Sequence, residues 1–165
     1  MNHIVTLLCA VTAIVSSAAE PALSAETAAK GASGDETAIR KVLERFGEAW
    51  NKHDAQAFSM AFAEDADFTN VLGMSAHGRT DIAKFHAPMF ATVFKDTSLK
   101  VDKVHVRFIK PDVAAVDEWW EMTGARDRSG REIPLRKGLL NLVMTRQDGT
   151  WVISVMHNMD LPASQ

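Results

Sequence analysis

One histidine closes an apolar stripe near the end of the sequence, where a titratable side chain is unusual. His157 alternates with Trp151, Ile153 and Val155 in a segment that predicts the last strand. An imidazole titrates near neutral pH and can act as a general base. We therefore predict His157 to be a catalytic base. The alternative is a core histidine that is hydrogen-bonded to a backbone carbonyl.

A second histidine and an asparagine are predicted to join His157 in the same interior. His86 shares one face of a predicted helix with Ile82 and Phe90, so the two imidazoles could serve as acid and base. The alternative for His86 is packing against the sheet rim. Asn70 shares a strand face with Phe68, and its neutral amide could orient a carbonyl, a hydroxyl or a water without burying a charge.

Tryptophan is the remaining aromatic donor, because the sequence contains no tyrosine. Trp119 and Trp120 are neighbours in a predicted strand, so one indole faces inward, and the sequence does not decide which. Trp119 shares its face with Asp117 and Trp120 shares its face with Glu118. We expect such carboxylates to be solvated or to lie at a dimer face. The predicted substrate-binding residues are Trp50, Phe68, Phe90, Trp119, Asn141 and Asn158.

Neither a metal, a cofactor nor a nucleic acid is predicted as a partner. The spacing of His77, His86 and His157 matches no standard metal motif. No glycine-rich dinucleotide fingerprint follows a predicted strand. The formal charge of −3 and the absence of a long basic run exclude the usual electrostatic footprint of nucleic-acid binding.

Helices followed by long strands must position these residues. Apolar spacing predicts a helix over 35–51, a short second helix capped by Asp54, and a third that begins near Thr80 and that Pro88 should kink or split. The predicted strands cover 68–72, 99–109, 113–124, 135–146 and 150–159. This order indicates an α+β fold in which about three N-terminal helices cover the concave face of a strongly bent sheet.

The outer face of that sheet also needs a cover. The segment 139–145 places Leu140, Leu142 and Met144 on one side and Leu139 and Val143 on the other, so both sides favour burial. We expect a second copy of the chain to cover the outer side, which gives a homodimer.

The N-terminal stretch is typical of an export signal. An apolar run from Ile4 to Val15, followed by small residues, predicts a secretory signal peptide over 1–25. A flexible lead-in over 26–34 and one domain over 35–162 should follow. The expected protein is periplasmic or secreted and has no stable membrane association after cleavage. An uncleaved anchor is the alternative.

Several segments together resemble a known family. They are Ala49-Trp50-Asn51 with Asp54, Phe68-Thr69-Asn70, Gly78-Arg79, and Gly149-Thr150-Trp151-Val152-Ile153 with His157-Asn158. Over about residues 35 to 160 the chain is similar to the SnoaL-like branch of the nuclear-transport-factor-2-like superfamily, and most similar to its SgcJ/EcaC group, also called DUF4440. The resemblance implies a cone-shaped fold. Epoxide-hydrolase relatives carry Tyr-x-Asn and a later Asp where this chain has Phe68-x-Asn70 and His157, which puts that reaction in doubt.

The residues and the resemblance together favour a protein that binds a small apolar molecule. The first hypothesis is a cofactor-free acid–base enzyme, namely an isomerase, cyclase, dehydratase or hydrolase that acts on an apolar cyclic substrate. The alternative is a non-catalytic secreted domain for ligand binding or dimerisation. The label of oxidoreductase that the SgcJ/EcaC group carries does not follow from any cofactor motif in the sequence.

Overall fold

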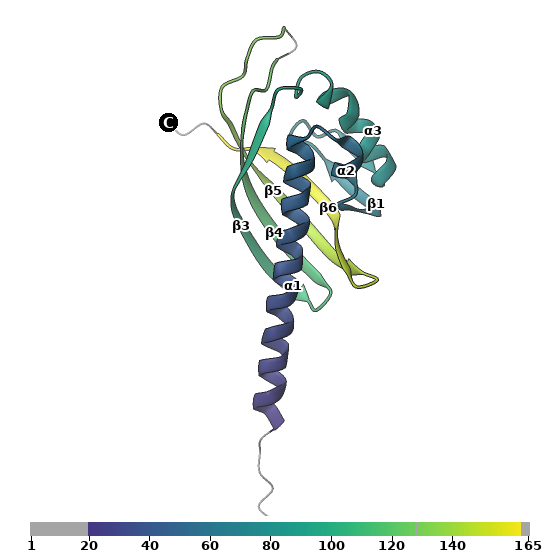
Figure 1. Cartoon of the computed structure of the whole chain (residues 1–165), viewed down its shortest axis with the longest axis vertical. Coiled ribbons are helices and arrows are strands. Elements are labelled where there is room, and N and C mark those ends of the chain that lie inside the picture. The colour runs from purple at the N-terminus through teal and green to yellow at the C-terminus, as the bar shows by residue number, and fades with distance from the viewer. Residues whose placement is uncertain (1–19, 128, 163–165) are drawn as a thin grey trace, which may run out of the picture.

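Three helices and six strands make up the domain in the computed structural model, which describes residues 20–127 and 129–162 (Figure 1). Most of the predicted signal peptide, 1–25, lies outside the described residues. In chain order the elements are α1 (Glu20–Asn51), α2 (Ala55–Ser59), β1 (Phe62–Thr69), β2 (Ser75–His77), α3 (Arg79–Phe90), β3 (Ser98–Lys110), β4 (Val113–Thr123), β5 (Arg136–Gln147) and β6 (Thr150–Asp160).

The strands form one mixed sheet in the order β2-β1-β6-β5-β4-β3. Strands β3 to β6 are consecutive antiparallel neighbours, as the sequence predicted, while β1 pairs with β6 in parallel. Figure 1 shows α1 lying along the long strands, with α2 and α3 beside its C-terminal end. The predicted α+β architecture is therefore confirmed.

Helix α1 begins upstream of its predicted start. The segment 26–34, expected to be a flexible lead-in, is helical, and the first half of α1 projects beyond the sheet (Figure 1). Alanine has the highest helix propensity, and the alanines of this segment favour continuation of the helix. The predicted inward face is correct, and its buried residues are Ile39, Val42, Leu43, Phe46 and Ala49.

Two helix boundaries follow from local chemistry. Asp54 caps α2 as predicted, because its Oδ1 accepts hydrogen bonds from the N–H groups of Gln56 at 3.0 Å and Ala57 at 2.9 Å. Gly78 precedes α3 with φ of 77°, and a Cβ at this position would lie 2.9 Å from the carbonyl oxygen of Glu64. Helix α3 then runs to Phe90 as one element with Pro88 inside it, so Pro88 does not split the helix.

The core lies between the helices and the concave face of the sheet. Aromatic rings from successive elements meet there: Phe58 of α2 lies 4.5 Å from Phe46 of α1 and 5.6 Å from Phe62 of β1, measured between ring centroids. All three side chains are at most 2% exposed. None of the helices within the described residues is long and apolar enough to cross a membrane. Phe46 of the aromatic layer also lines a cavity.

Candidate functional site

A cavity of about 830 Å³ opens between α1, α3 and the concave face of β4 to β6. This volume suits a small organic molecule. Aromatic and aliphatic side chains dominate its wall, and the aromatic ones are Phe46, Trp50, Phe68, Phe94 and Trp120. Of the predicted pocket aromatics, Trp50 and Phe68 thus line the cavity, whereas Phe90 is buried behind the wall at 5.0 Å from Trp50, measured between ring centroids.

A β-bulge in β6 decides which residues of this strand face the cavity. Val143 pairs with Val155 and Met144 pairs with Ile153, so Ser154 is an extra residue in β6. The alternation of faces is shifted by one residue beyond this point, and both Ile153 and Met156 are buried.

His157 therefore lies on the outer face of the sheet. Its side chain is exposed and does not line the cavity. The prediction that it closes an inward stripe is wrong, because the stripe assumed unbroken alternation from Ile153 to His157. A catalytic base in the cavity cannot be supplied by this residue, and His157 and His86 do not face each other.

Asn158, one residue further on, lines the cavity in place of His157. Its Oδ1 accepts a hydrogen bond of 3.0 Å from Nε1 of Trp120. An indole N–H is only a donor, so this contact fixes the orientation of the amide. The Nδ2 group of Asn158 has no partner among the described residues and can donate to a molecule in the cavity.

The same contact shows that Trp120 is the inward tryptophan, with 4% of its surface exposed. Two other predicted pocket residues lie on the opposite face. Trp119 packs beneath the ammonium group of Lys103, 4.9 Å from the ring centroid, and Asn141 donates a hydrogen bond of 2.6 Å to Oδ1 of Asp117. Both predictions are corrected, since in β4 and β5 these residues alternate with the inward-facing ones.

Asn70 lines the cavity, but its carbonyl oxygen already has structural partners. Oδ1 accepts hydrogen bonds from the backbone N–H groups of Leu72 and Met74, each at 2.9 Å, and so holds the loop between β1 and β2. Leu72 and Met74 are 74% and 45% exposed and also line the cavity. Asn70 therefore shapes an apolar rim.

His86 is the titratable group in the deep wall. It is 2% exposed and sits among aromatic rings, with centroid distances of 4.3 Å to Phe58 and 4.8 Å to Phe68. Its Nδ1 lies 2.8 Å from the carbonyl oxygen of Ile82. A carbonyl can only accept, so Nδ1 carries the hydrogen and Nε2 presents a lone pair.

Burial lowers the pKa of His86 to about 4, against the opposing effect of the hydrogen bond to Ile82. The ring is neutral at neutral pH. Its Nε2 has no hydrogen-bonding partner among the described residues, and His86 lines the cavity. The deep wall thus offers one acceptor, while Asn158 offers a donor.

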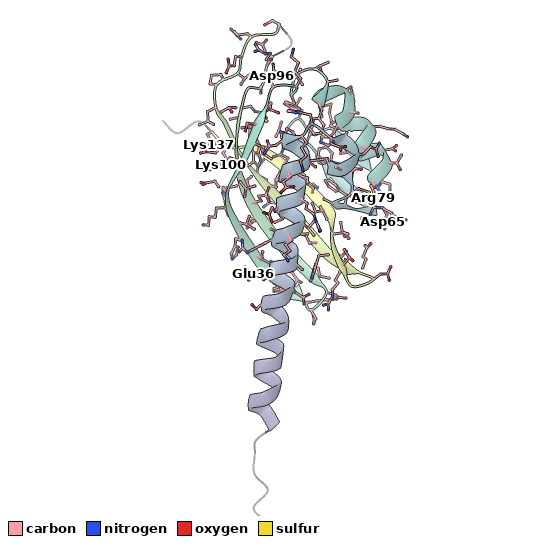
Figure 2. All side chains as sticks on the ribbon, viewed as in Figure 1. Glu36, Asp65, Arg79, Asp96, Lys100 and Lys137 are labelled. Carbon is pink, nitrogen blue, oxygen red and sulfur yellow. The ribbon has the colours of Figure 1, made fainter. Side chains whose placement is uncertain are left out.

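Charged residues gather at the mouth of the cavity, where they pair with one another. Arg136 binds Asp160 at 2.7 Å and lies over the ring of Trp120 at 5.6 Å. Arg126 binds Asp96 at 3.4 Å, and Asp96 lies at the end of the molecule where the β4–β5 connection projects (Figure 2). The mouth consequently carries no large excess of either charge.

Glu118 is the residue that sequence reasoning missed. It is completely buried on the inner face of β4, and both carboxylate oxygens lack a hydrogen-bonding partner among the described residues. Burial raises its pKa to about 8. We expected the β4 carboxylates to be solvated or at a dimer face, but Glu118 shares the inward face with Trp120. The two residues are two positions apart in one strand, so the inward placement of Trp120 implies an inward placement of Glu118.

No group of three or more potential metal ligands occurs within residues 20–127 and 129–162. The arrangement can hold an apolar body, accept one hydrogen bond at Nε2 of His86 and donate one from Nδ2 of Asn158.

Comparison with known proteins agrees with this architecture. The model of the SnoaL-like domain family matches residues 43–153. No curated protein matches the sequence significantly. Among solved structures, a domain of unknown function with a cystatin-like fold from Nostoc punctiforme is 30% identical, with a TM-score of 0.70 over 79% of both chains.

Two solved structures with lower identity share the fold. A putative scytalone dehydratase from Novosphingobium aromaticivorans is 17% identical, with a TM-score of 0.70 over 81% of this chain and 89% of that one. A hexachlorocyclohexane dehydrochlorinase, LinA-type3, from Novosphingobium barchaimii is 14% identical, with a TM-score of 0.73 over 80% of this chain and 90% of that one. At these identities the likeness concerns the fold alone.

Proposed function

Because the chain belongs to the SnoaL-like domain family, we propose that it binds a small, largely apolar molecule in the cavity between α1, α3 and the sheet. The observation that carries this proposal is the free Nε2 of His86, an acceptor in a largely apolar wall that has no partner among the described residues. A ligand hydroxyl or N–H group satisfies it. Nδ2 of Asn158 can then donate a hydrogen bond to an acceptor group of the ligand.

Binding fits His86 better than proton abstraction does. A general base works best when its pKa lies near the operating pH, and burial holds the pKa of His86 at about 4. Its Nδ1 is bonded to a backbone carbonyl, so within the described residues no carboxylate raises its basicity. The imidazole is therefore suited to accepting a hydrogen bond.

A cofactor-free acid–base enzyme is the second candidate. It is supported by the fold shared with structures described as a putative scytalone dehydratase and a dehydrochlorinase. In this alternative, Nε2 of His86 takes a proton from the bound molecule and Asn158 holds an oxygen atom. The reaction would be an elimination or isomerisation on an apolar ring.

The narrower family group and the cellular location are also proposals. Assignment to the SgcJ/EcaC group is supported by Ala49-Trp50-Asn51 and by the closing segment from Gly149 to Ile153. Export to the periplasm or medium is supported by the apolar run from Ile4 to Val15.

A homodimer through the outer sheet face is supported by the residues on that face. Trp119 pairs with Leu139, which pairs with Met159, and beyond one polar row Val143 pairs with Val155. Met159 is 39% exposed and the other four are half-buried. A second copy of the chain would cover this apolar patch.

Matched probes test the binding proposal. The protein is titrated with 2-naphthol and with naphthalene while tryptophan fluorescence is followed. We expect 2-naphthol to bind about threefold to tenfold more tightly, because its hydroxyl gains one hydrogen bond. His86→Leu should remove this difference, and His157→Ala, which changes an exposed histidine outside the cavity, should keep it. Equal affinities, or no binding of either probe, would refute the proposal.

A further inference from the structure

Glu118 is a buried carboxyl that the proposed contacts leave unused. It is 0% exposed, and neither oxygen has a hydrogen-bonding partner among the described residues. Buried polar groups in proteins are almost always hydrogen-bonded, because an unpaired one loses its bonds to water without replacing them. An unsatisfied carboxyl of this kind therefore points to a partner that the polypeptide itself does not supply.

The residues that flank Glu118 in the sheet are apolar. In the register of the sheet it stands between Val104 of β3 and Leu140 of β5. Helix α1 packs on β3 at the neighbouring pair, where a Cβ on Gly47 would lie 4.0 Å from Val101, the partner of Trp120. The buried face of α1 is also apolar, with Leu43 and Phe46.

Charged groups of the neighbouring elements are turned away or committed elsewhere. Arg40 of α1 reaches the carbonyl oxygen of Val104 at 3.4 Å, but its exposed guanidinium is paired with Glu36 at 2.7 Å. His105 and Asp117 are 61% and 41% exposed and lie on the outer face. Burial is the one cause of the raised pKa of Glu118, and no charged group among the described residues contributes to it.

The carboxyl lies next to the cavity wall. Trp120, two residues along β4, and Leu140, directly across on β5, both line the cavity. Leu140 pairs in turn with Asn158 of β6, which also lines the cavity. Glutamate has three rotatable side-chain bonds, and side chains in strands lean along the strand. Glu118 is not itself a lining residue, so contact with a ligand requires its carboxyl to change rotamer toward the cavity.

We propose that Glu118 binds a basic nitrogen of the ligand, so that the cavity takes small hydrophobic amines. This inference rests on the proposed binding function. An ammonium group supplies the missing counter-charge, and the aromatic faces of Trp50 and Trp120 in the wall attract cations. When the ammonium form binds, Glu118 releases its carboxyl proton to the solvent, and the ammonium N–H groups donate to the carboxylate.

A pair of probes that differ in charge tests this inference. The probes are 1-naphthylmethylamine and 1-naphthylmethanol, which share the ring and the linker, and binding is measured by calorimetry at pH 7. We expect the amine to bind at least about tenfold more tightly than the alcohol. In buffers of different ionisation enthalpy, amine binding should release about one proton, since Glu118 starts protonated and ends ionised.

Variants separate this inference from the binding function itself. Glu118→Gln should abolish both the preference for the amine and the proton release while alcohol binding stays within about twofold. Glu118→Leu, which removes a buried unpaired polar group, should do the same, and circular dichroism checks that both variants fold. Binding of both probes without preference, or a preference unchanged in Glu118→Gln, overturns the role of Glu118 and leaves the proposed binding function standing. Binding of neither probe overturns the proposed function and this inference together.

Discussion

The indole Nε1 of Trp120 donates a 3.0 Å hydrogen bond to Oδ1 of Asn158, and this contact turns the Nδ2 group of Asn158 toward the cavity. The two residues come from strands that are not neighbours in the sheet, because β5 lies between them. Gly138 makes the contact possible, since a Cβ there would lie 2.0 Å from the Trp120 ring. The donor in the cavity wall thus depends on a glycine in the intervening strand.

Replacement of Asn158 by leucine tests this contact. Trp120 is 4% exposed, so its N–H would lose its acceptor without gaining water. We expect Asn158→Leu to lower the free energy of unfolding by about 1–3 kcal/mol, measured by urea denaturation. His157→Leu, one residue away on the exposed face, is the matched control and should change it by less than about 0.5 kcal/mol. Equal effects of the two substitutions would contradict the contact.

Glu118 predicts a specific pH dependence of stability. Its pKa is raised to about 8 in the folded state from an ordinary value of 4.5, so the folded state holds the proton more tightly than the unfolded state does. Stability is therefore lost as the pH rises from about 4.5 to about 8. Glu118→Gln should remove this loss, and at pH 8 it should be more stable than the wild type by several kcal/mol.

Urea denaturation of both proteins from pH 5 to pH 9 measures this effect. Glu44→Gln, at an exposed position on α1, is the matched control and should leave the pH profile of the wild type unchanged. A constant difference in stability between Glu118→Gln and the wild type across this range would show that Glu118 does not titrate as described.

His86 predicts the opposite dependence at lower pH. Its pKa is lowered to about 4 from 6.5, so the unfolded state binds the proton more readily. The stability that neutral His86 contributes to the folded state is present above about pH 6.5 and is lost as the pH falls toward 4. In NMR spectra, one imidazole signal should titrate near pH 4 and disappear in His86→Gln. If the signal lost in that variant titrates between pH 6 and pH 7, the burial argument fails.

The proposed dimer gives a prediction independent of the cavity. A charge on the outer apolar patch should disfavour association, so Leu139→Glu is expected to sediment as a monomer where the wild type sediments as a dimer. Binding of 2-naphthol should persist, because Leu139 lies on the face opposite the cavity. Thr123→Glu, at an exposed site at the end of β4, serves as the control. A monomeric wild type would end this proposal.

The elements of the fold were largely predictable from the sequence, because they follow from local patterns. The apolar stripe from Ile39 to Ala49 predicted the buried face of α1, and Asp54 predicted the start of α2. The turns between β3 and β6 also marked the meander correctly. Strand β1 begins at Phe62 rather than near 68. Its first half was not predicted, because the two adjacent exposed residues Glu64 and Asp65 interrupt the alternating pattern of a strand.

The candidate site was less predictable, since it depends on non-local geometry. The bulge at Ser154 exists only in the pairing of β6 with β5, and it exchanges the faces of His157 and Asn158. The inward direction of Glu118 depends equally on the placement of β4 against α1. Periodicity did place His86 toward the interior, because a helix keeps its phase over its length.

A crystal structure of the protein with 2-naphthol tests the central claim most directly. We predict the naphthalene ring inside the cavity, between the walls formed by Trp50 and Trp120, with its hydroxyl within about 3.2 Å of Nε2 of His86. Density for 2-naphthol outside the cavity, or a hydroxyl directed away from His86 toward the mouth, would contradict the account.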